Sequence, residues 1–307
     1  MHPADGRIPS QAFPFINRPT VLGHEIAGVV VEAGDAAPLK VGDRVVSLHW
    51  ASCGSCEACL DGRTTHCSSG WDSFLALTTD GGYAEYVRTG ASAFVPVPDG
   101  WSAVDAASVN CTYGTVYHGA FTRGRLRAGE RVLVTGASGG VGTAMVQLAK
   151  AMHCEVIAVT SSPDKVDALL ALGADEVIVH AKDTPFHKDA CIGEGVDMAF
   201  EAVGEPTFLS SMHSLKRGGR LVLIGNVTAG KITMPLGATI VKGLEIIGSD
   251  SCSPGELKAV FALMDKVGIR PIIAKTMGLE GAAEAHDILE RQGVSGGRII
   301  LKVGDEW

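Results

Sequence analysis

Four cysteines stand close together in the first third of the chain. Cys53, Cys56, Cys59 and Cys67 follow the pattern C-x2-C-x2-C-x7-C. Four thiolates at such spacing can close a tetrahedral shell around zinc with no open coordination position. A closed shell leaves no place for a substrate, so we predict a structural zinc that staples the lobe 53–67. An iron–sulfur cluster is the alternative, but the residues that follow do not resemble a ferredoxin loop.

A second set of zinc-type ligands is more widely spread. His24 and Glu25 follow the apolar pair at 21–22, and Cys111 stands in the run VNCTYGT. Imidazole, carboxylate and thiolate all bind zinc, and a site with three protein ligands keeps one position open for a substrate. These residues predict a catalytic zinc site, provided that the fold brings them together.

The run RVLVTGASGGVG at 131–142 has the pattern of a strand, a glycine-rich turn and the start of a helix. Glycines let the backbone turn sharply and approach a pyrophosphate, and the helix N-terminus presents free N–H groups to the phosphates. An ordinary strand–helix turn is the alternative, but this run stands among repeated strand–helix units. We therefore predict a dinucleotide site. Its expected contacts are Gly136, Ser138, Gly139, Gly140, Val141 and Gly142.

The end of the next predicted strand indicates which dinucleotide binds. An NAD-binding protein usually places Asp or Glu there, whereas this chain has Thr160, then Ser161 and Ser162, and shortly afterwards Lys165. Hydroxyl groups and a lysine can hold a 2′-phosphate, so we predict NADP(H) in preference to NAD(H). The serines can also cap the helix that begins at Pro163, and the two roles are compatible.

The elements that must position these residues change in kind along the chain. Up to about residue 110 the pattern is of short strands, at 26–32, 44–47 and 83–87 among others. From 131 onward, short apolar runs alternate with helical patterns, which predicts a parallel sheet covered on both faces. The predicted fold class is therefore α/β, with a doubly wound Rossmann sheet and a second, mostly β domain.

Composition narrows the classes of partner. The chain has 307 residues, enough for two domains, and a net charge of −8, which argues against a nucleic-acid partner. Its apolar runs are too short to span a membrane, and its first residues lack a signal-peptide core. We expect a cytoplasmic protein with a small-molecule substrate, whose cysteines are metal ligands or buried thiols.

Several motifs occur in a known order. VLGHE, the cysteine lobe, CTYGT, TGASGGVG, LGADEVI, EAVG and GGRIILKV follow one another as in zinc-dependent alcohol dehydrogenases. Over essentially its whole length the chain resembles the zinc-dependent medium-chain dehydrogenase/reductase family. The resemblance implies a GroES-like catalytic domain at 1–116, a Rossmann domain at 117–252 and a return to the catalytic domain at 253–307. It also implies a homodimer or homotetramer.

The resemblance carries roles onto individual residues. It implies that His24 and Cys111 are catalytic zinc ligands and that Glu25 is a nearby or exchanging ligand. His49 and Trp50 fall where the family places substrate-pocket side chains. Cofactor contacts are implied for Thr115, Val203, Ile224, Gly225 and Arg298.

One family feature falls outside the sequence. The family's first catalytic cysteine would precede Met1, so the resemblance implies a chain shortened at its N-terminus, with His2 in the place of the proton-relay histidine. The loss of that cysteine would weaken the zinc site. An inactive NADPH-binding remnant is accordingly one of the functions that we consider.

The predicted function is zinc-dependent, NAD(P)H-linked hydride transfer between the nicotinamide and an alcohol or carbonyl substrate. The stretches SLHWASCGSC and IGNVTAG resemble the acryloyl-CoA reductase branch of the family. That similarity gives an alternative, the NADPH-dependent reduction of an activated C=C bond in acryloyl-CoA or a quinone. The sequence leaves the physiological substrate and the direction of the reaction open.

Overall fold

The computed structural model describes residues 20–307, apart from 182–183, 191–193, 228–229, 292–295 and 305–306. The predicted relay residue His2 therefore lies outside the described residues. The chain forms two compact units. Unit 1 contains the residues up to Gly114 together with Ser251–Val294 and Arg298–Trp307, and unit 2 contains Thr115–Asp250 with 295–297. The sequence placed the two changes of domain after residues 116 and 252.

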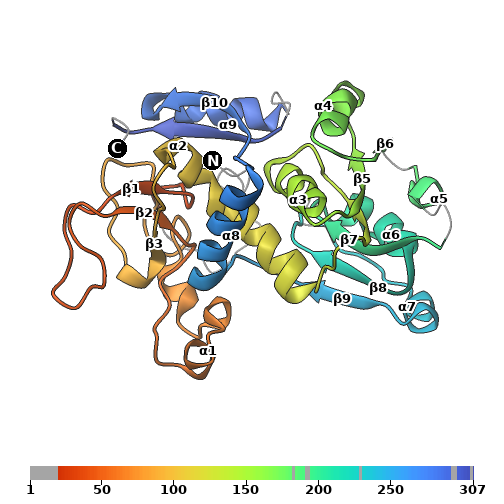
Figure 1. Ribbon diagram of the computed structural model, residues 1–307, viewed down its shortest axis with the longest axis horizontal. Coiled ribbons are helices and arrows are strands. Elements are labelled where there is room, and N and C mark those ends of the chain that lie inside the picture. The colour runs from red at the N-terminus through yellow and green to blue at the C-terminus, as the bar shows by residue number, and fades with distance from the viewer. Residues whose placement is uncertain (1–19, 182–183, 191–193, 228–229, 292–295, 305–306) are drawn as a thin grey trace. The chain divides into compact units, whose positions relative to one another are not determined.

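Unit 2 is built on a six-stranded sheet in which all neighbouring strands are parallel (Figure 1). The strand order is β6-β5-β4-β7-β8-β9. The strands are β4 (Arg131–Val134), β5 (Glu155–Thr160), β6 (Glu176–Val179), β7 (Val196–Glu201), β8 (Leu215–Leu223) and β9 (Glu245–Gly248). The order reverses direction between β4 and β7, which is the switch point where such sheets bind ligands.

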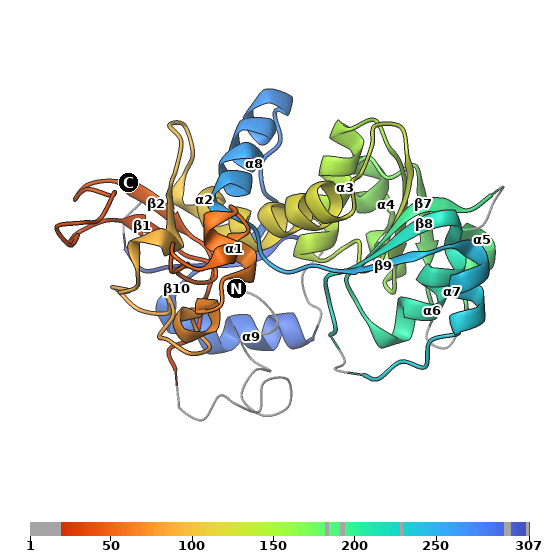
Figure 2. The same ribbon diagram turned by 90° about the horizontal axis from the view of Figure 1, so that it is seen from below.

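Helices cover both faces of this sheet. They are η6 (Tyr117–Arg123), α3 (Gly140–Ala151), η7 (Pro163–Lys165), α4 (Val166–Ala171), α5 (His187–Ala190), α6 (Glu205–Ser214) and α7 (Leu236–Lys242). Figure 2 shows α3 and α4 on one face and α6 and α7 on the other. Apolar strand residues such as Leu133 and Leu221 pack against Phe208 and Met212 of α6. The predicted doubly wound sheet is confirmed.

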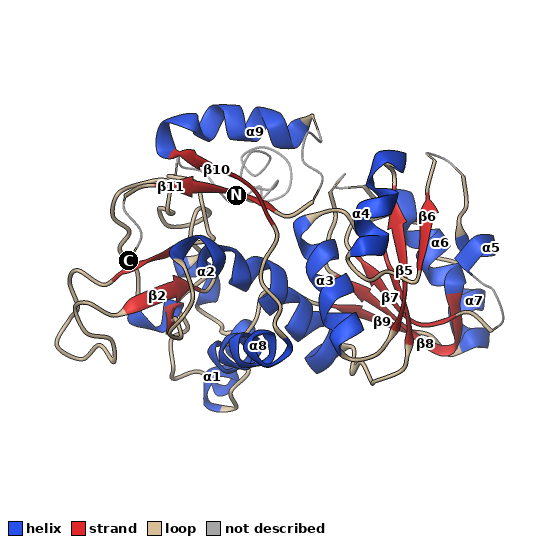
Figure 3. Ribbon diagram, turned by 45° about the horizontal axis from the view of Figure 1, so that its top comes forward, coloured by secondary structure: helices blue, strands red, loops and turns tan. Residues whose placement is uncertain are grey.

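Unit 1 combines short strands with helices. Antiparallel β1 (Ala27–Val29), β2 (Arg44–Ser47) and β3 (Phe94–Pro96) form one sheet, and parallel β10 (Ile273–Gly278) and β11 (Arg298–Lys302) form another. The longer helices are α2 (Ala103–Val109), α8 (Pro254–Val267) and α9 (Ala282–Glu290), and Figure 3 shows α9 lying along β10. The shorter ones are α1 (Glu57–Leu60), η2 (Thr64–His66), η3 (Gly70–Ser73), η4 (Ala91–Ala93), η5 (Asn110–Gly114) and η8 (Leu279–Gly281).

Helix α8, the first element after the chain returns to unit 1, is fixed by its end caps and by contacts with Trp101. Its first turn has a complete capping box, in which Ser253 and Glu256 satisfy each other's backbone N–H groups, and Gly268 ends the helix in the left-handed conformation. The Trp101 indole donates a hydrogen bond to the Asp265 carboxylate at 3.1 Å, and the Arg270 guanidinium lies over the indole ring. These contacts fix α8 against the N-terminal part of unit 1.

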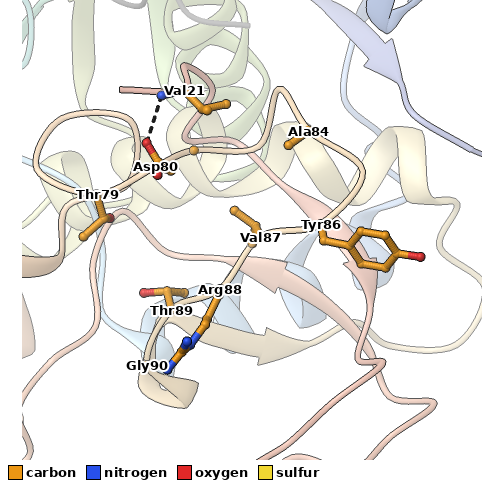
Figure 4. Close-up of a pocket in the computed structure, with 10 residues that line it drawn as sticks. Val21, Thr79, Asp80, Ala84, Tyr86, Val87, Arg88, Thr89 and Gly90 are labelled. Carbon is orange, nitrogen blue, oxygen red and sulfur yellow. Dashed lines mark hydrogen bonds between the residues drawn. The ribbon is translucent and has the colours of Figure 1, made fainter. Parts of the chain in front are cut away.

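The strand predicted at 83–87 was wrong. Backbone hydrogen bonds join 21–23 to 81–83, after which the chain continues without regular structure. Within the described residues no strand pairs with 83–87, so the alternating pattern has no sheet to join. Instead, residues 84 and 86–90 line a cavity of about 800 Å³ together with Val21 and 79–81 (Figure 4). Two of the lining residues are joined by a hydrogen bond, in which the Val21 N–H donates to the Asp80 carboxylate at 3.1 Å.

Among the described helices, none is both long and apolar enough to cross a bilayer.

Candidate functional site

His24 is held by a tight turn of the backbone. Gly23 before it has φ +92°, and a Cβ atom at that position would collide with the Tyr83 ring. The Ser47 hydroxyl donates to the His24 carbonyl at 3.2 Å and accepts from the Ile26 N–H at 3.1 Å. Only glycine can adopt this backbone conformation and also fit in the space beside the Tyr83 ring. Gly23 therefore fixes the backbone direction from which the His24 side chain projects.

Cys111 lies in the π-helical segment η5, which continues directly from α2. The Ser102 hydroxyl caps α2 by accepting from the Asp105 N–H at 3.1 Å. The buried Cys252 thiol donates to the Asn110 side-chain oxygen at 3.2 Å, and a Cβ on Gly114 would lie 2.6 Å from the Cys252 sulfur. Short segments of π-helix are rare and are frequently found at functional sites. Here the segment carries the thiol of Cys111 into the buried interior of unit 1.

His49 follows β2 and enters the same region from a third direction. The Leu75 N–H donates to the His49 carbonyl at 2.9 Å. The imidazole stacks on the Phe74 ring at 5.6 Å between centroids and 6° between planes. Trp50 packs on both rings, and its indole N–H donates to the Thr64 carbonyl at 3.4 Å. An aromatic wall therefore fixes the plane of the His49 ring.

The side chains of His24, His49 and Cys111 converge, and all are buried, with 6%, 7% and 6% of their surfaces exposed. One nitrogen or sulfur atom from each lies within 4.8 Å of the others. His24 Nε2 and Cys111 Sγ are 3.6 Å apart. Zinc bond lengths of about 2.0–2.1 Å to nitrogen and 2.3 Å to sulfur give a tetrahedral N–S edge of about 3.6 Å. The donor set therefore fits zinc in both chemistry and size.

Glu25, the residue next to His24, points elsewhere. Its carboxylate accepts a hydrogen bond from Arg298 Nε at 3.1 Å, and both side chains are buried. Glu25 is not part of the convergent set of His24, His49 and Cys111. The structure thus joins two residues that the sequence assigned separately, one to the metal and one to the cofactor pyrophosphate.

The four cysteines of the lobe 53–67 meet as predicted. Their sulfur atoms all lie within 4.8 Å of one another, and Cys53 and Cys59 are 3.9 Å apart. A tetrahedral zinc site with bonds of 2.3 Å has S–S edges of about 3.8 Å. The N–H groups of Cys53 and Cys56 donate to cluster sulfurs at 3.3 Å, so the loop is already folded around the site.

The protonation of these thiols is set by the loop. Hydrogen bonds from the backbone N–H groups of Ser55 and Cys56, and then from the Ser55 hydroxyl, lower the pKa of Cys53 to about 6. Desolvation raises the pKa of Cys59 to about 12. In the metal-free lobe the Cys53 thiol therefore ionises more readily than the Cys59 thiol, and zinc binds thiolates.

The predicted dinucleotide residues gather at the carboxyl ends of β4, β7 and β8. Gly136 turns the chain at φ +58°, and a Cβ on Gly142 would lie 2.6 Å from the Ala137 backbone. A Cβ on Gly225 would meet the Ala202 backbone, and the Val203 side chain lies against Gly136. The first turn of α3 contains Gly140, Val141 and Gly142, where N–H groups are free for an anion. These residues lie at the switch point of the sheet.

The residues predicted to select the cofactor lie beside the glycine-rich turn, since Thr160 contacts Ser138. The hydroxyls of Thr160 and Ser138 are 3.3 Å apart, and the Ser162 N–H donates to Thr160 Oγ1 at 3.2 Å. Ser161 is exposed, whereas Lys165 is buried in η7.

Two more predicted cofactor residues belong to unit 2. Thr115 is buried, and its hydroxyl has no hydrogen-bond partner within the part of the chain that the structure describes. The N–H of Ile224 donates to the Glu201 carbonyl at 2.9 Å, next to the loop that carries Val203.

A buried carboxylate supports this loop, and the sequence did not predict its role. Glu201 is fully buried at the end of β7. Its Oε1 accepts hydrogen bonds from the N–H groups of Val203 and Gly204 at 3.0 and 2.9 Å, and from the Thr207 and Thr135 hydroxyls at 2.6 and 2.9 Å. The Ser211 hydroxyl donates to Oε2 at 2.5 Å. Glu201 therefore holds the loop after β7 in place.

The sequence of the chain matches two protein-family models and several known proteins. The alcohol dehydrogenase GroES-like domain matches residues 1–99, and the zinc-binding dehydrogenase family matches residues 140–266. An acryloyl-coenzyme A reductase of Sulfurisphaera tokodaii is 37% identical over 94% of this chain and 85% of its own length. The chain belongs to the zinc-dependent medium-chain dehydrogenase/reductase family. It is an oxidoreductase of the alcohol dehydrogenase type.

Two further relatives agree with this assignment. An alcohol dehydrogenase of Geobacillus stearothermophilus is 33% identical over 93% of this chain and 83% of its own length. The crystal structure of an NAD-dependent alcohol dehydrogenase matches with a TM-score of 0.86 at 31% identity, covering 95% of this chain and 85% of that one. The predicted family, the Rossmann and GroES-like folds and the oxidoreductase class are confirmed.

Proposed function

We propose that the chain uses NADP(H) for reversible hydride transfer to or from the carbon of an alcohol or carbonyl substrate. The observation that carries this proposal is the buried approach of His24 and Cys111, at the 3.6 Å separation of two zinc ligands. A zinc ion bound there would act as a Lewis acid toward the substrate oxygen.

The residues of unit 2 would bind and orient the cofactor. The N–H groups at the start of α3 face the position of a pyrophosphate, and the glycines at 136 and 142 let it approach the backbone. Val203 and Gly225 would border the nicotinamide end, since they lie at the ends of the two strands beyond the switch point. Thr115 would contact the nicotinamide ring through its buried hydroxyl.

The preference for NADPH is supported by the hydroxyl groups at the end of β5 and by Lys165. A 2′-phosphate would accept hydrogen bonds from Ser161 and Ser162, and the Lys165 ammonium would balance its charge. We expect Lys165→Ala to weaken NADPH binding at least 10-fold and to leave NADH binding unchanged in fluorescence titrations. Lys188→Ala, an exposed lysine of α5, is the matched control. Equal losses for both cofactors would contradict this role for Lys165.

The test of the main proposal is a substrate panel of primary and secondary alcohols, aldehydes, acryloyl-CoA and quinones, followed by NADPH absorbance. We expect turnover with a carbonyl or alcohol and its loss in His24→Ala, while NADPH binding persists. Turnover of His24→Ala at the original rate would refute the zinc role. Cofactor binding without turnover on any compound would support the inactive remnant instead.

A second candidate is reduction of an activated C=C bond. It is favoured by the 37% identity to acryloyl-coenzyme A reductase. In that reaction the hydride would go to the β-carbon and a proton to the α-carbon of the thioester. Turnover of acryloyl-CoA with no turnover of aldehydes would select this candidate over the first.

We also propose that two copies associate through unit 2. Strand β9 is at one end of the sheet order, and the preceding helix α7 exposes Leu236, Ile240 and Val241, with 62%, 77% and 66% of their surfaces accessible. An open strand edge beside exposed apolar residues is a surface that pairing can cover. Light scattering should give at least a dimer for the parent chain and a smaller species for Ile240→Lys. The control, Leu60→Lys in the cysteine lobe, should not change the mass.

A further inference from the structure

We propose that Tyr83 and His286 are positioning residues that fix the direction in which His24 enters its proposed metal site. They would act through the backbone of Gly23 and not by contact with the metal or the substrate. This inference rests on the proposed function, because it concerns a side chain that would bind the catalytic zinc. It gives a role to a tyrosine and a histidine to which the sequence assigned none.

The backbone behind His24 is the first observation. The N–H groups of residues 81–83 donate to the carbonyls of residues 21–23, at distances of 2.7–2.9 Å. A Cβ atom on Gly81 would collide with the Gly23 carbonyl, so the two segments are in close contact. These hydrogen bonds hold the turn before His24 against the segment that ends at Tyr83.

The Tyr83 ring lies against the same turn. Gly23 has φ +92°, and a Cβ atom there would collide with Cδ1 and Cε1 of the ring. Closely packed atoms cannot move independently, so a shift of the ring changes the space left for the Gly23 backbone. His24 is the next residue, and the direction of its side chain follows the peptide plane that it shares with Gly23.

His286 holds the far end of that ring. The Tyr83 hydroxyl and His286 Nε2 are 3.4 Å apart, and the ring centroids are 6.0 Å apart with the planes at 54°. His286 belongs to α9, and Tyr83 packs against the apolar cluster of Ala285 and Ile299. At 3.4 Å the hydrogen bond is long, so we expect its loss alone to have a small effect and the loss of the whole ring a larger one.

The residue on the other side of His24 is held from the same stretch of chain. Glu25 accepts a hydrogen bond from Arg298 Nε at 3.1 Å, and Arg298 begins β11. Strand β11 pairs with β10, along which α9 lies (Figure 3). The chain neighbours of His24 on both sides are therefore tied to the C-terminal stretch of unit 1, one of them through Tyr83.

Zinc affinity tests the proposal without relying on activity. The parent chain should hold about two zinc ions, one in the cysteine lobe and a second at His24, measured by mass spectrometry and by competition with a chromophoric chelator. Tyr83→Phe and His286→Ala each remove one partner of the hydrogen bond and should weaken the second zinc about 3-fold. Tyr83→Ala removes the ring and should weaken it about 10–100-fold, the range for the loss of a group that supports a metal ligand.

Two further readouts follow the turn and the metal separately. The amides of Gly81 and Gly82 should exchange faster in Tyr83→Ala, because they donate to the carbonyls of the turn that the ring holds. The visible bands of bound Co²⁺ should shift in the same variant, since they depend on the directions of the ligands. The milder Tyr83→Phe and His286→Ala variants keep the test valid if Tyr83→Ala does not fold.

Three variants serve as controls. Tyr86→Phe removes the hydroxyl of a tyrosine that is 73% exposed and should leave the zinc affinity unchanged. Asp287→Ala changes the exposed neighbour of His286 on α9 and should do the same. His286→Gln keeps a side chain that can hydrogen-bond to the Tyr83 hydroxyl and should restore the parent affinity. Since alanine is the better helix former, weaker zinc binding in His286→Ala cannot come from a lower helix propensity of α9.

The outcomes separate this inference from the proposed function. If the parent chain binds a second zinc that His24→Ala loses, while the Tyr83 and His286 variants bind it at parent affinity, the positioning role is refuted and the proposed metal site stands. If the parent chain binds only the zinc of the cysteine lobe, the proposed metal site is refuted, and this inference with it. A small loss in Tyr83→Phe and His286→Ala, a larger loss in Tyr83→Ala and recovery in His286→Gln establish the positioning role.

Discussion

Glu201 offers the sharpest test of how unit 2 holds the loop after β7. In Glu201→Ala the N–H groups of Val203 and Gly204 lose the acceptor that they have in the structure. An unsatisfied buried donor costs about 1–3 kcal/mol. The Thr135 hydroxyl can turn to the Phe200 carbonyl and the Thr207 hydroxyl to the Gly204 carbonyl, each 3.4 Å away. The two hydroxyls therefore lose less free energy than the two N–H groups. The free energy of unfolding should therefore fall by about 3–5 kcal/mol.

Glu201→Gln refines the expectation. The amide oxygen can still accept the four hydrogen bonds of Oε1, and the new NH₂ group faces the Ser211 hydroxyl, which can turn to accept from it. Only the charge is lost, so the cost should be about 1–2 kcal/mol. Glu205→Ala, at the exposed first turn of α6, is the control and should stay within about 0.5 kcal/mol.

The assay is urea unfolding together with amide hydrogen exchange and NADPH titration. Exchange at Val203 and Gly204 should accelerate in Glu201→Ala before the rest of β7 changes, and NADPH binding should weaken because the loop borders the proposed cofactor site. Equal losses below about 1 kcal/mol for the alanine and glutamine variants would refute the reasoning, since the carboxylate would then not be holding the loop.

Two other predictions follow from local geometry. Gly23→Ala should lower the free energy of unfolding by about 1–2 kcal/mol for the left-handed backbone alone. The collision of the new Cβ atom with Tyr83 should also displace His24, so zinc analysis should show loss of the second metal. Gly28→Ala, which has open space around it, is the control and should keep that metal. In the chelator-treated protein, the rate of Cys53 alkylation, mapped by mass spectrometry, should rise with increasing pH and have its midpoint near pH 6. The lowered pKa of Cys53 makes the reactive thiolate the main form above that pH and the thiol the main form below it. Ser55→Ala should move this midpoint upward, and a midpoint near pH 8.5 in the parent chain would contradict the assignment.

Much of the fold could be predicted from short-range patterns. The cysteine lobe and the glycine turn at 136–142 are local, since their chemistry depends on neighbours a few positions away. The strands of unit 2 were equally visible as continuous apolar runs between helices. The strand expected at 83–87 failed because an alternating pattern shows that a segment suits a sheet, not that a partner strand is there to pair with it.

The convergence of His24, His49 and Cys111 shows what the sequence could not predict. His24 and Cys111 were grouped by their residue types and by the family resemblance, whereas His49 belongs to the cluster only because β2 and the turn at Gly23 bring two distant histidines to one place. The position of His49 just before the cysteine lobe was visible, but nothing in its spacing distinguishes a ligand from a pocket side chain. Glu201 was missed for a similar reason, since five donors from separate positions surround it only in the folded chain.

The division of unit 1 into separate stretches of chain imposes an order on its assembly during synthesis. His24, His49 and Cys111 are all made before residue 115, yet η5, which carries Cys111, packs against α8 and is bonded by Cys252. That partner emerges about 140 residues later, which at about 5–20 residues per second is a delay on the order of 10 s. The main stretch of unit 2, Thr115–Asp250, is synthesised in that interval. The Cys111 thiol therefore passes through translation without its final cover, and newly made chains have a period in which metal capture or oxidation competes with the completion of unit 1.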